Sequence, residues 1–440
     1  MRAQPLILKA LSSGALACVL AGCSTPEVDD VTWQCTQEAD CGSGYVCERT
    51  AGLCRPADGA GRNGILDDEV RLGVVLPLSK GPTEAALAWQ AGLEAALEPI
   101  NRRGGIHGRQ ITLAVRDDAH QPETALAVLS ELTSRRQVLA VLGGFGNHVA
   151  QVVGRDLEDR GVAFVARSGG VEGRQVPAAR YLFAVSAGDA TEIGALVAGL
   201  VADDVHLSNV AVLLQATPNG EAPDAQGQSV QDALRAAGIA APGEGLVASG
   251  GDVTPAVDSI RAWMAAPERV ASEDGRVRTA VILTTEAATA ARFVRDLSAG
   301  SRPEDLAQPR FLATGAPGAS ALAAALADLE PALDPACGTG VRFALGVPSW
   351  LATTPTARDY RAALPAGAEP GDVSFEGYLT GRLIIAALEA QGREITGESF
   401  VDTLQETAVA HGGGFTPERH HAIRAVAGAT LTPTCEIELD

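Results

Sequence analysis

The chain has 440 residues with a formal net charge of −20, and 46% of its residues are hydrophobic but only 4% are aromatic. A chain this long exceeds one hydrophobic core, so we expect more than one domain, built mainly on Ala, Val and Leu. The strong negative charge, with no basic patch against it, excludes nucleic acid as an expected partner.

The N-terminus has the pattern of an export signal. Two basic residues precede an apolar run at 10–20 that ends in Leu20-Ala21-Gly22-Cys23. The run is too short to span a bilayer, and small residues precede the cysteine, so residues 1–22 are predicted to be a signal peptide. The motif resembles the bacterial lipobox, which implies lipidation of Cys23; an ordinary signal with an incidental cysteine is the alternative. Ser24 resembles an outer-membrane address, so we expect a lipid-anchored protein of the periplasm or cell surface.

Cleavage would leave a net charge of −22 and seven cysteines, one of them lipidated. Four of the others lie in a short module at 23–56, and a segment this small is held by cross-links rather than by a core. We predict two disulfides there, with three connectivities open; zinc is the alternative, but the paired CxxC knuckles are absent. The module resembles small cysteine-rich segments of the Dickkopf N-terminal type and is expected to serve as a spacer or docking surface. Its cysteines are Cys35, Cys41, Cys47 and Cys54.

A Gly- and Asp-rich linker is predicted at 57–68, and regular elements follow it. Residues 70–76 form an apolar run that predicts a strand, which ends at Pro77. Thr83 is expected to cap a helix that closes at Gly104-Gly105. A strand at 111–115 and a helix at 124–134 come next.

The most informative stretch is a strand–helix–strand unit. A β-branched run at 138–142 meets the glycine-rich turn Gly143 to Gly146, and Asn147 opens a segment with helical spacing of apolar residues. A second strand is predicted at 162–166. Such a unit implies a parallel sheet, whose strands deliver their C-terminal turns to the edge where open α/β sheets bind ligands.

Several of these motifs, in this order, resemble type I periplasmic binding proteins of the branched-chain amino acid class. They include Pro77-Leu78-Ser79, Ile100-Asn101, Asp117-Asp118, Gly143-Gly144, Tyr181-Leu182-Phe183 and the helix at 375–389. The resemblance implies an α/β fold of two doubly wound parallel-sheet lobes joined by a three-strand hinge. The expected ranges are 69–186 plus 343–412 for lobe 1 and 187–342 plus 413–440 for lobe 2.

On this map the ligand would lie in an interlobe cleft. Backbone N–H groups of Phe145, Gly146 and Asn147 at a helix N-terminus favour an anion such as a carboxylate. Arg167 is unexpected at its position, where it would pair with an acidic ligand or with Asp117 or Asp118. Further contacts are expected from Ser79, Ser168 and Gly169 of lobe 1 and from Gln215, Thr217 and Glu286 of lobe 2, with Glu286 facing an amine.

Each of these assignments has a structural alternative, since a tight turn alone requires glycines and an acid often opens a surface helix. Relatives carry an acidic residue where this chain reads Gly315-Ala316-Pro317, so the ligand class need not be an amino acid. The map puts Cys337 and Cys435 in the same lobe, and we predict that they are bonded to each other. The pair His420-His421 is not expected to bind a metal.

The sequence therefore predicts a binding protein without catalytic activity or cofactor, which takes an amino acid or a related amide or carboxylate. Its expected partner is an ABC permease or a surface partner. A surface sensor or scaffold with a degenerate cleft is the alternative. A remote alternative is an NADP-dependent oxidoreductase, because Gly144-x-Gly146 follows a strand and Arg167 ends the next one.

Overall fold

The structure is a computed structural model. It describes residues 64–440 apart from 134–137, 168–178, 217–221, 249, 300–308, 330–339, 394, 410–412, 417–419 and 424–425, together with Thr36, Tyr45–Glu48 and Leu53–Pro56. Only the backbone is described for those two N-terminal strands and for 147–148, 225–226, 408–409 and 413. The predicted signal peptide, Cys23, Cys35, Cys41 and the linker up to residue 63 lie outside the described residues.

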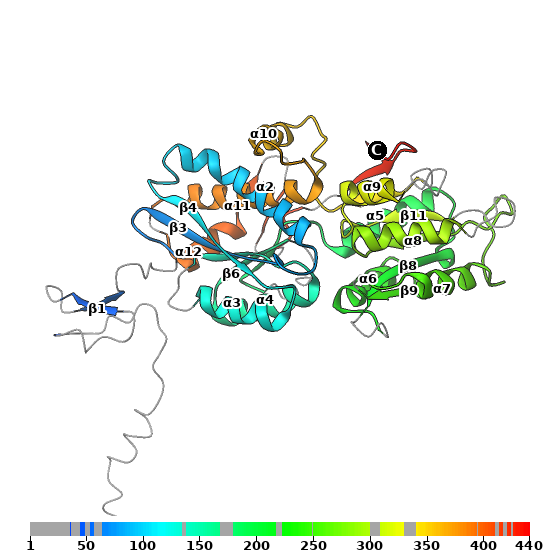
Figure 1. Cartoon of the computed structure of the whole chain (residues 1–440), viewed down its shortest axis with the longest axis horizontal. Coiled ribbons are helices and arrows are strands. Elements are labelled where there is room, and N and C mark those ends of the chain that lie inside the picture. Colours follow the sequence, from blue (N-terminus) through cyan, green and yellow to red (C-terminus); the bar gives the residue numbers. More distant parts are fainter. Residues whose placement is uncertain are drawn as a thin grey trace, which may run out of the picture. The chain divides into compact units, whose positions relative to one another are not determined.

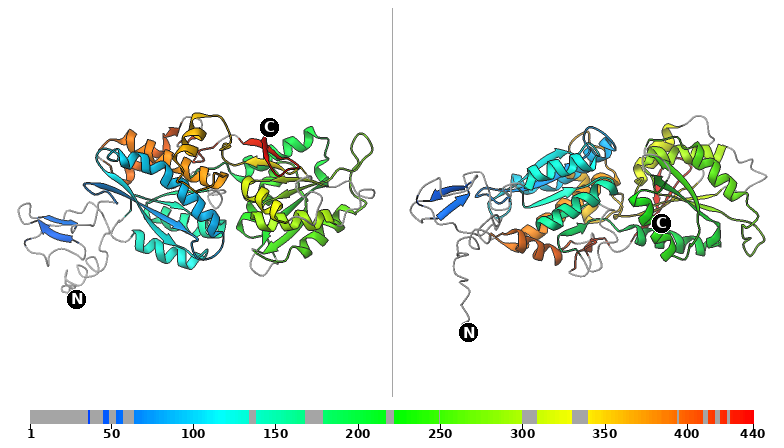
Figure 2. Two further views of the ribbon diagram at one scale, coloured as in Figure 1. Left: turned by 45° about the horizontal axis from the view of Figure 1, so that its top comes forward. Right: turned by 90° about the horizontal axis from the view of Figure 1, so that it is seen from below.

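The chain forms two compact units, Met1–Gly59 and Ala60–Asp440. In the first, β1 (Tyr45–Glu48) pairs antiparallel with β2 (Leu53–Pro56), and Cys47 stands opposite Cys54 in the register. The second unit holds two large sheets, each with helices on both faces (Figures 1 and 2).

The first large sheet is five-stranded and entirely parallel. Its spatial order is β4 (Gln110–Asp117), β3 (Glu69–Leu76), β5 (Ala140–Gly143), β6 (Ala163–Ala166) and β7 (Leu182–Ala184). Strand residues of alternating position enter different cores: Leu72, Val74 and Leu76 face one cluster of buried side chains and Val75 faces the other. The first cluster is covered by α2 (Thr83–Arg102), α10 (Pro355–Ala363), α11 (Asp372–Gln391) and α12 (Gly397–Gln405), and the second by α3 (Pro122–Thr133) and α4 (Asn147–Arg160).

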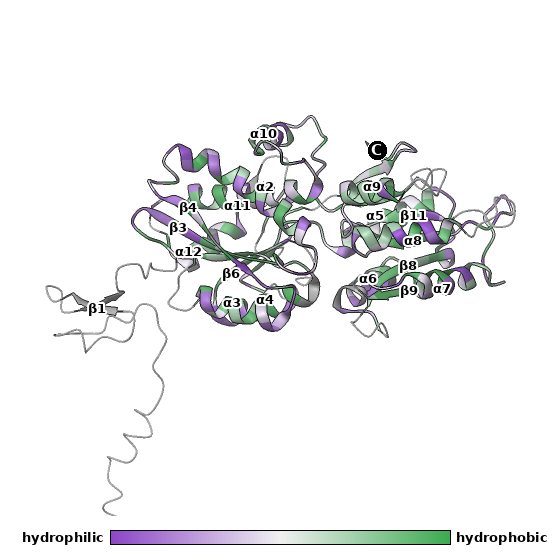
Figure 3. Ribbon diagram, viewed as in Figure 1, coloured by the Kyte–Doolittle hydropathy of each residue, from purple (hydrophilic) through white to green (hydrophobic). Residues whose placement is uncertain are grey.

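The second large sheet is seven-stranded, and β15 runs antiparallel to both of its neighbours, β12 and β16, while the other pairs are parallel. Its order is β16 (Ile437–Leu439), β15 (Ala427–Leu431), β12 (Arg342–Leu345), β11 (Arg310–Ala313), β10 (Ala280–Leu283), β8 (Val210–Ala216) and β9 (Gly243–Ala248). One face carries α5 (Asp189–Ala202) and α6 (Ala225–Ala236), and the other α7 (Thr254–Met264), α8 (Ala287–Ala299) and α9 (Ala319–Asp328). A short 3₁₀ helix, Leu207–Asn209, precedes β8, and β13 (Ala408–Val409) pairs with β14 (Gly413–Gly414). The strands of both sheets are mostly hydrophobic, as a sheet covered on both faces requires (Figure 3).

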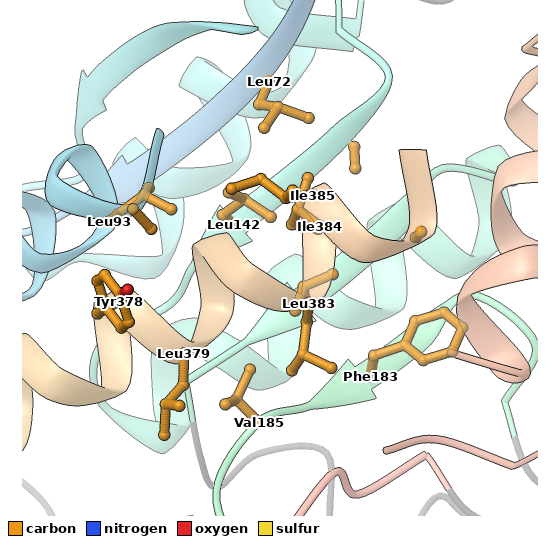
Figure 4. Close-up of a cluster of buried hydrophobic side chains, with 14 of the residues drawn as sticks. Leu72, Leu93, Leu142, Phe183, Val185, Tyr378, Leu379, Leu383, Ile384 and Ile385 are labelled. Carbon is orange, nitrogen blue, oxygen red and sulfur yellow. The ribbon is translucent and has the colours of Figure 1, made fainter. Parts of the chain in front are cut away.

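Two long helices, α2 and α11, pack backbone against backbone in the first lobe. A Cβ atom on Gly92 would lie 1.7 Å from the carbonyl oxygen of Ser374, and one on Gly377 would lie 2.0 Å from that of Trp89. The apolar side chains of α11 also pack toward the sheet, and Figure 4 shows Leu379 and Leu383 pointing toward Val185 and Phe183. This late helix therefore completes the core of the first lobe.

The chain passes between the two sheets three times: after β7, after β12 and before β15. The passing segments bond to one another, with Ala422 N–H donating to the Ala184 carbonyl (2.9 Å) and Ala187 N–H to the Gly346 carbonyl (2.7 Å). Phe415, Ala422 and Ile423 belong to the core of the first lobe. The lobe ranges remain a proposal, and we now place the inner boundaries between residues 345 and 347 and between 423 and 427.

The expected α/β fold with parallel sheets is confirmed, and so is the strand–helix–strand unit: β5 and β6 are parallel and α4 begins at Asn147. The predicted cap at Thr83 is wrong. Thr83 is already inside α2, Pro82 is the N-cap, and no side chain caps this helix end. In the part of the chain that the structure describes, no helix combines the length and hydropathy needed to cross a bilayer.

Candidate ligand-binding site

The turn between β5 and α4 is built from three glycines with left-handed φ values, 108° at Gly143, 75° at Gly144 and 79° at Gly146. A Cβ atom on Gly143 would lie 2.4 Å from the carbonyl oxygen of Val75, so glycine is needed for the turn itself. The turn also leaves donors: among the described residues, nothing accepts a hydrogen bond from the N–H groups of Phe145 and Gly146. Asn147 is the first residue of α4, so these donors lie at a helix N-terminus.

Arg167 follows β6 and lies beside this turn. Its Nε donates to Glu376 Oε2 at 2.7 Å, and its guanidinium carbon lies 4.8 Å from the centre of the Phe145 ring. The side chain of Arg167 is 16% exposed and that of Glu376 only 5%. Burial raises the pKa of Glu376, while the charge of Arg167 acts in the opposite direction. Arg167 thus pairs with Glu376, on α11, and not with Asp117 or Asp118.

Ser79 lies in the loop after β3 and is exposed. Its hydroxyl and its N–H bond to the Asp117 carboxylate, which also accepts the N–H groups of Leu78 (2.9 Å) and Ala119 (2.8 Å). These bonds hold the pKa of Asp117 below its ordinary value, although desolvation acts against them. Asp117 therefore fixes the loop that follows β3, at the C-terminal edge of the sheet, and Ser79 is part of that arrangement.

Asp118, next to it, is fully buried. Its Oδ1 accepts the N–H of His120 at 2.7 Å, whereas Oδ2 has no partner among the described residues. Burial raises the pKa of this carboxyl to about 6, and the neighbouring charge of Asp117 adds to the effect. Ala119 and His120 both have positive φ values, 49° and 57°, which non-glycine residues seldom adopt.

We expect Asp118→Asn to stabilise the protein at pH 8 by about 2 kcal/mol. A carboxyl whose pKa is raised on folding contributes its full stability below its ordinary pKa of 3.8, and that contribution is lost as the pH rises through about 6. Asparagine keeps the acceptor for His120 but never ionises. Urea unfolding at pH 4.5 and pH 8 measures the difference, which should be small at pH 4.5; a variant less stable than the wild type at pH 8 would contradict the assignment.

Two of the residues predicted in the second lobe, Gln215 and Glu286, lie at the corresponding edge of its sheet. Gln215 is near the end of β8 and half-buried. Glu286 precedes α8, and its Oε1 accepts the Gly250 N–H at 3.2 Å and the Thr289 hydroxyl at 3.1 Å. These bonds support the structural interpretation of Glu286 and leave its contact with an amine as a prediction.

One acid at this edge was not predicted. Glu192, in the first turn of α5, is buried, and its Oε2 accepts the Gly315 N–H at 2.6 Å. A Cβ atom on Gly346 would lie 2.3 Å from Glu192 Oε1, so the carboxylate occupies space that the glycine leaves open. A carboxylate thus does lie at the Gly315 turn, although it comes from a different part of the chain.

A second acid missed by the sequence joins the two lobes. Asp372, the first residue of α11, accepts the N–H of Ser320 at 2.9 Å and its hydroxyl at 3.2 Å, at the start of α9 in the second lobe. Trp350 Nε1 donates to the same hydroxyl at 3.2 Å. Burial raises the pKa of Asp372. One face of α11 therefore carries Asp372 toward the second lobe and Glu376, one turn later, toward Arg167.

The other predicted residues are not placed. Ser168, Gly169, Thr217, Cys337 and the side chain of Asn147 lie outside the described residues. Cys435 is disulfide-bonded, and its pairing with Cys337 stays a prediction. His420 is buried against Phe183, with ring centres 4.3 Å apart, and its Nδ1 lies 2.8 Å from the Leu182 carbonyl oxygen. No cluster of His, Cys, Asp or Glu suited to a metal occurs among the residues that the structure places.

Comparison with known proteins gives consistent results. Residues 69–435 match the family model described as "Periplasmic binding protein". A possible leucine/isoleucine/valine-binding protein from Rhodopirellula baltica has the same fold, with a TM-score of 0.70, 19% identity and coverage of 85% of this chain and 96% of that one. The branched-chain amino acid transporter substrate-binding protein of Streptococcus pneumoniae, solved with isoleucine, gives a TM-score of 0.64, 16% identity and coverage of 85% and 99%.

A curated relative shows higher sequence identity over a short stretch. An amino acid binding protein of Pseudomonas aeruginosa is 35% identical over 77 residues, which are 18% of this chain. The matched stretch spans only 21% of the length of that relative.

Proposed function

Because the chain belongs to the periplasmic binding protein family, we propose that it is an extracytoplasmic solute-binding protein that captures a small polar ligand between its two lobes. The observation that carries the proposal is the set of hydrogen-bond donors after β5 and β6. The N–H groups of Phe145 and Gly146 have no acceptor among the described residues, and the Arg167 guanidinium stands beside them. The three passages between the lobes supply the hinge for closure around a ligand.

The ligand proposed is an amino acid or a related amide or carboxylate, and the chain would bind it without catalysing a reaction. Proteins of this family bind small ligands and interact with ABC permeases. Delivery to such a permease, or sensing, is the proposed use. The family match and the position of the glycine turn on β5, rather than on the first strand of the sheet, favour binding over a nucleotide-dependent oxidoreductase.

We propose further that the mature chain begins at a lipidated Cys23 and is anchored in the outer membrane. The motif before Cys23 supports this, and an intact mass without added lipid would contradict it. In the cysteine module, the register that sets Cys47 opposite Cys54 suits a disulfide between them, because directly opposed residues bring their Cα atoms to about 4.5–5.5 Å.

A thermal-shift screen of the chain from residue 24 tests the proposed function. A ligand at about 100 times its dissociation constant should stabilise the protein by about 2.7 kcal/mol, a shift of a few degrees at this size. Amino acids, short amides, small carboxylates and sugars form the panel. If none of them shifts the unfolding temperature, the proposal of small-solute capture fails and a scaffold or protein-sensing role takes its place.

A further inference from the structure

We propose that the ligand is a small organic carboxylate, gripped by Arg167, and that Glu376 acts as the positioning residue for that arginine. The inference rests on the proposed function, since it names the ligand class of the same site. The inference depends on one observation: Arg167 and Glu376 are joined by a single hydrogen bond, from Nε to Oε2, so that other polar atoms of both side chains have no partner among the described residues.

The guanidinium of Arg167 is held in place, but only one of its N–H donors has an acceptor among the described residues. Glu376 takes the Nε donor at 2.7 Å, and the Phe145 ring packs against the guanidinium with its centre 4.8 Å from Cζ. An arginine has five N–H donors in a fixed fork, so four remain on the two Nη atoms. Among the described residues no acceptor contacts them, and the side chain keeps 16% of its surface exposed. Within the described part of the chain, the edge of the guanidinium that binds a carboxylate through two parallel bonds therefore has no acceptor.

The free edge lies beside a second source of positive potential. Phe145, which packs against the guanidinium, directly precedes Gly146, the N-cap of α4. The N–H groups of Phe145 and Gly146 have no acceptor in the described part of the chain, and a helix N-terminus favours negative charge. The charged fork thus packs on the side chain of the residue that precedes this helix end, and both features favour an anion.

Glu376 has the features of a positioning group rather than of a simple structural partner. Its Oε1 is buried and has no partner among the described residues, while Oε2 holds Arg167. A pair kept only for stability would be expected to satisfy its buried oxygen, because half-satisfied polar pairs cost free energy. Holding the arginine by Nε alone fixes its plane and leaves both Nη atoms for a ligand.

Two acids of the second lobe, Glu286 and Glu192, already accept hydrogen bonds from the protein, so neither requires an ammonium group of the ligand as a partner. Glu286 already accepts the N–H of Gly250, and Glu192 accepts that of Gly315. An amine of the ligand would have to compete with these bonds, whereas a carboxylate would meet the free donors of the first lobe. The ligand class that fits is a carboxylate without an α-amino group.

Isothermal titration with matched triads tests this on the chain from residue 24. Each triad keeps one carbon skeleton and offers it as a carboxylate, as an amino acid and as an amide: 4-methylpentanoate, leucine and 4-methylpentanamide; 3-phenylpropanoate, phenylalanine and 3-phenylpropanamide; succinate, aspartate and succinamide. We expect the carboxylate of at least one triad to bind at least tenfold more tightly than its two relatives. An amino acid or an amide that binds as tightly as its carboxylate would overturn the inference and leave the proposed function intact. Silence across every triad would overturn the inference, while the thermal-shift screen decides the proposed function separately.

Three variants separate contact from positioning. The double variant Arg167→Gln/Glu376→Gln keeps a neutral pair that folds without a buried charge, and it should lose roughly 10- to 100-fold in carboxylate affinity. Glu376→Gln alone removes the negative charge nearest the ligand and should tighten binding roughly two- to tenfold. Arg180→Gln removes an exposed arginine paired with Glu398 and Asp402 and serves as the matched control, with no change expected. Equal losses in the single and double variants would mean that the pair is only structural, and would overturn the inference.

Discussion

Arg167→Gln alone should lower the free energy of unfolding by about 3 kcal/mol at pH 7.5, because it leaves the carboxylate of Glu376 buried without a cation. The side chain of Glu376 is only 5% exposed, and its one ionic partner among the described residues is Arg167. Urea unfolding measures the loss.

The same variant should recover as the pH falls. Burial raises the pKa of Glu376, so the protonated carboxyl is favoured in the fold and the penalty of the missing cation disappears at acidic pH. We expect the deficit at pH 5 to be clearly smaller than at pH 7.5, and the double variant with Glu376→Gln to regain most of the stability at both. The exposed pair of Arg116 and Glu131 offers a control, since Arg116→Gln should cost less than about 1 kcal/mol. A deficit that does not depend on pH would show that the lost stability comes from packing and not from the charge.

Gly377→Ala should destabilise the protein by about 3 kcal/mol or more, because the new methyl group has no room between α2 and α11. The added Cβ would lie 2.0 Å from the carbonyl oxygen of Trp89, which belongs to the backbone of α2 and cannot turn aside. The two helices would have to separate and open the core that Figure 4 shows around Leu93 and Leu383. Thermal and urea unfolding report the loss.

Gly194→Ala is the matched control within another helix. Gly194 lies inside α5, and a Cβ atom there would have nothing within 4 Å. With no clash, alanine should stabilise the helix by about 0.5–1 kcal/mol through its better helix propensity. If both substitutions had the same small effect, the close packing of α2 on α11 would not be a requirement of the fold.

The parts of the fold that could be predicted are those that a short stretch of sequence determines by its own residue pattern. The run at 138–142, the glycines that follow it and the apolar spacing after Asn147 each specify their own element, and together they define β5, α4 and β6. The helix at 375–389 was expected from the family resemblance instead, and α11 extends it at both ends. Thr83 was misjudged because a threonine before an apolar stretch suits a cap, while the preceding proline already fixed the chain for the helix start.

The site depends on contacts that no local pattern contains. Arg167 and Glu376 are 209 residues apart, and Asp372 meets Ser320 across 52 residues and two lobes. One signal was available: Asp372 and Glu376 are acids one turn apart at the start of a mostly apolar helix, and buried acids need partners. That signal marks the residues but does not identify which cation or which helix end they meet.

The late position of α11 in the chain affects how the first lobe folds during synthesis. The strands of the first lobe leave the ribosome, and would leave any export channel, almost two hundred residues before the helix that covers one of their faces. Until residues 372–391 arrive, the side chains of Leu72, Val74 and Leu142 have no α11 to pack against, whereas the second lobe already holds β8 to β12 with α5 to α9. The first lobe therefore keeps one apolar face of its sheet without α11 while its chain is unfinished, and an apolar face left exposed during folding is prone to aggregation.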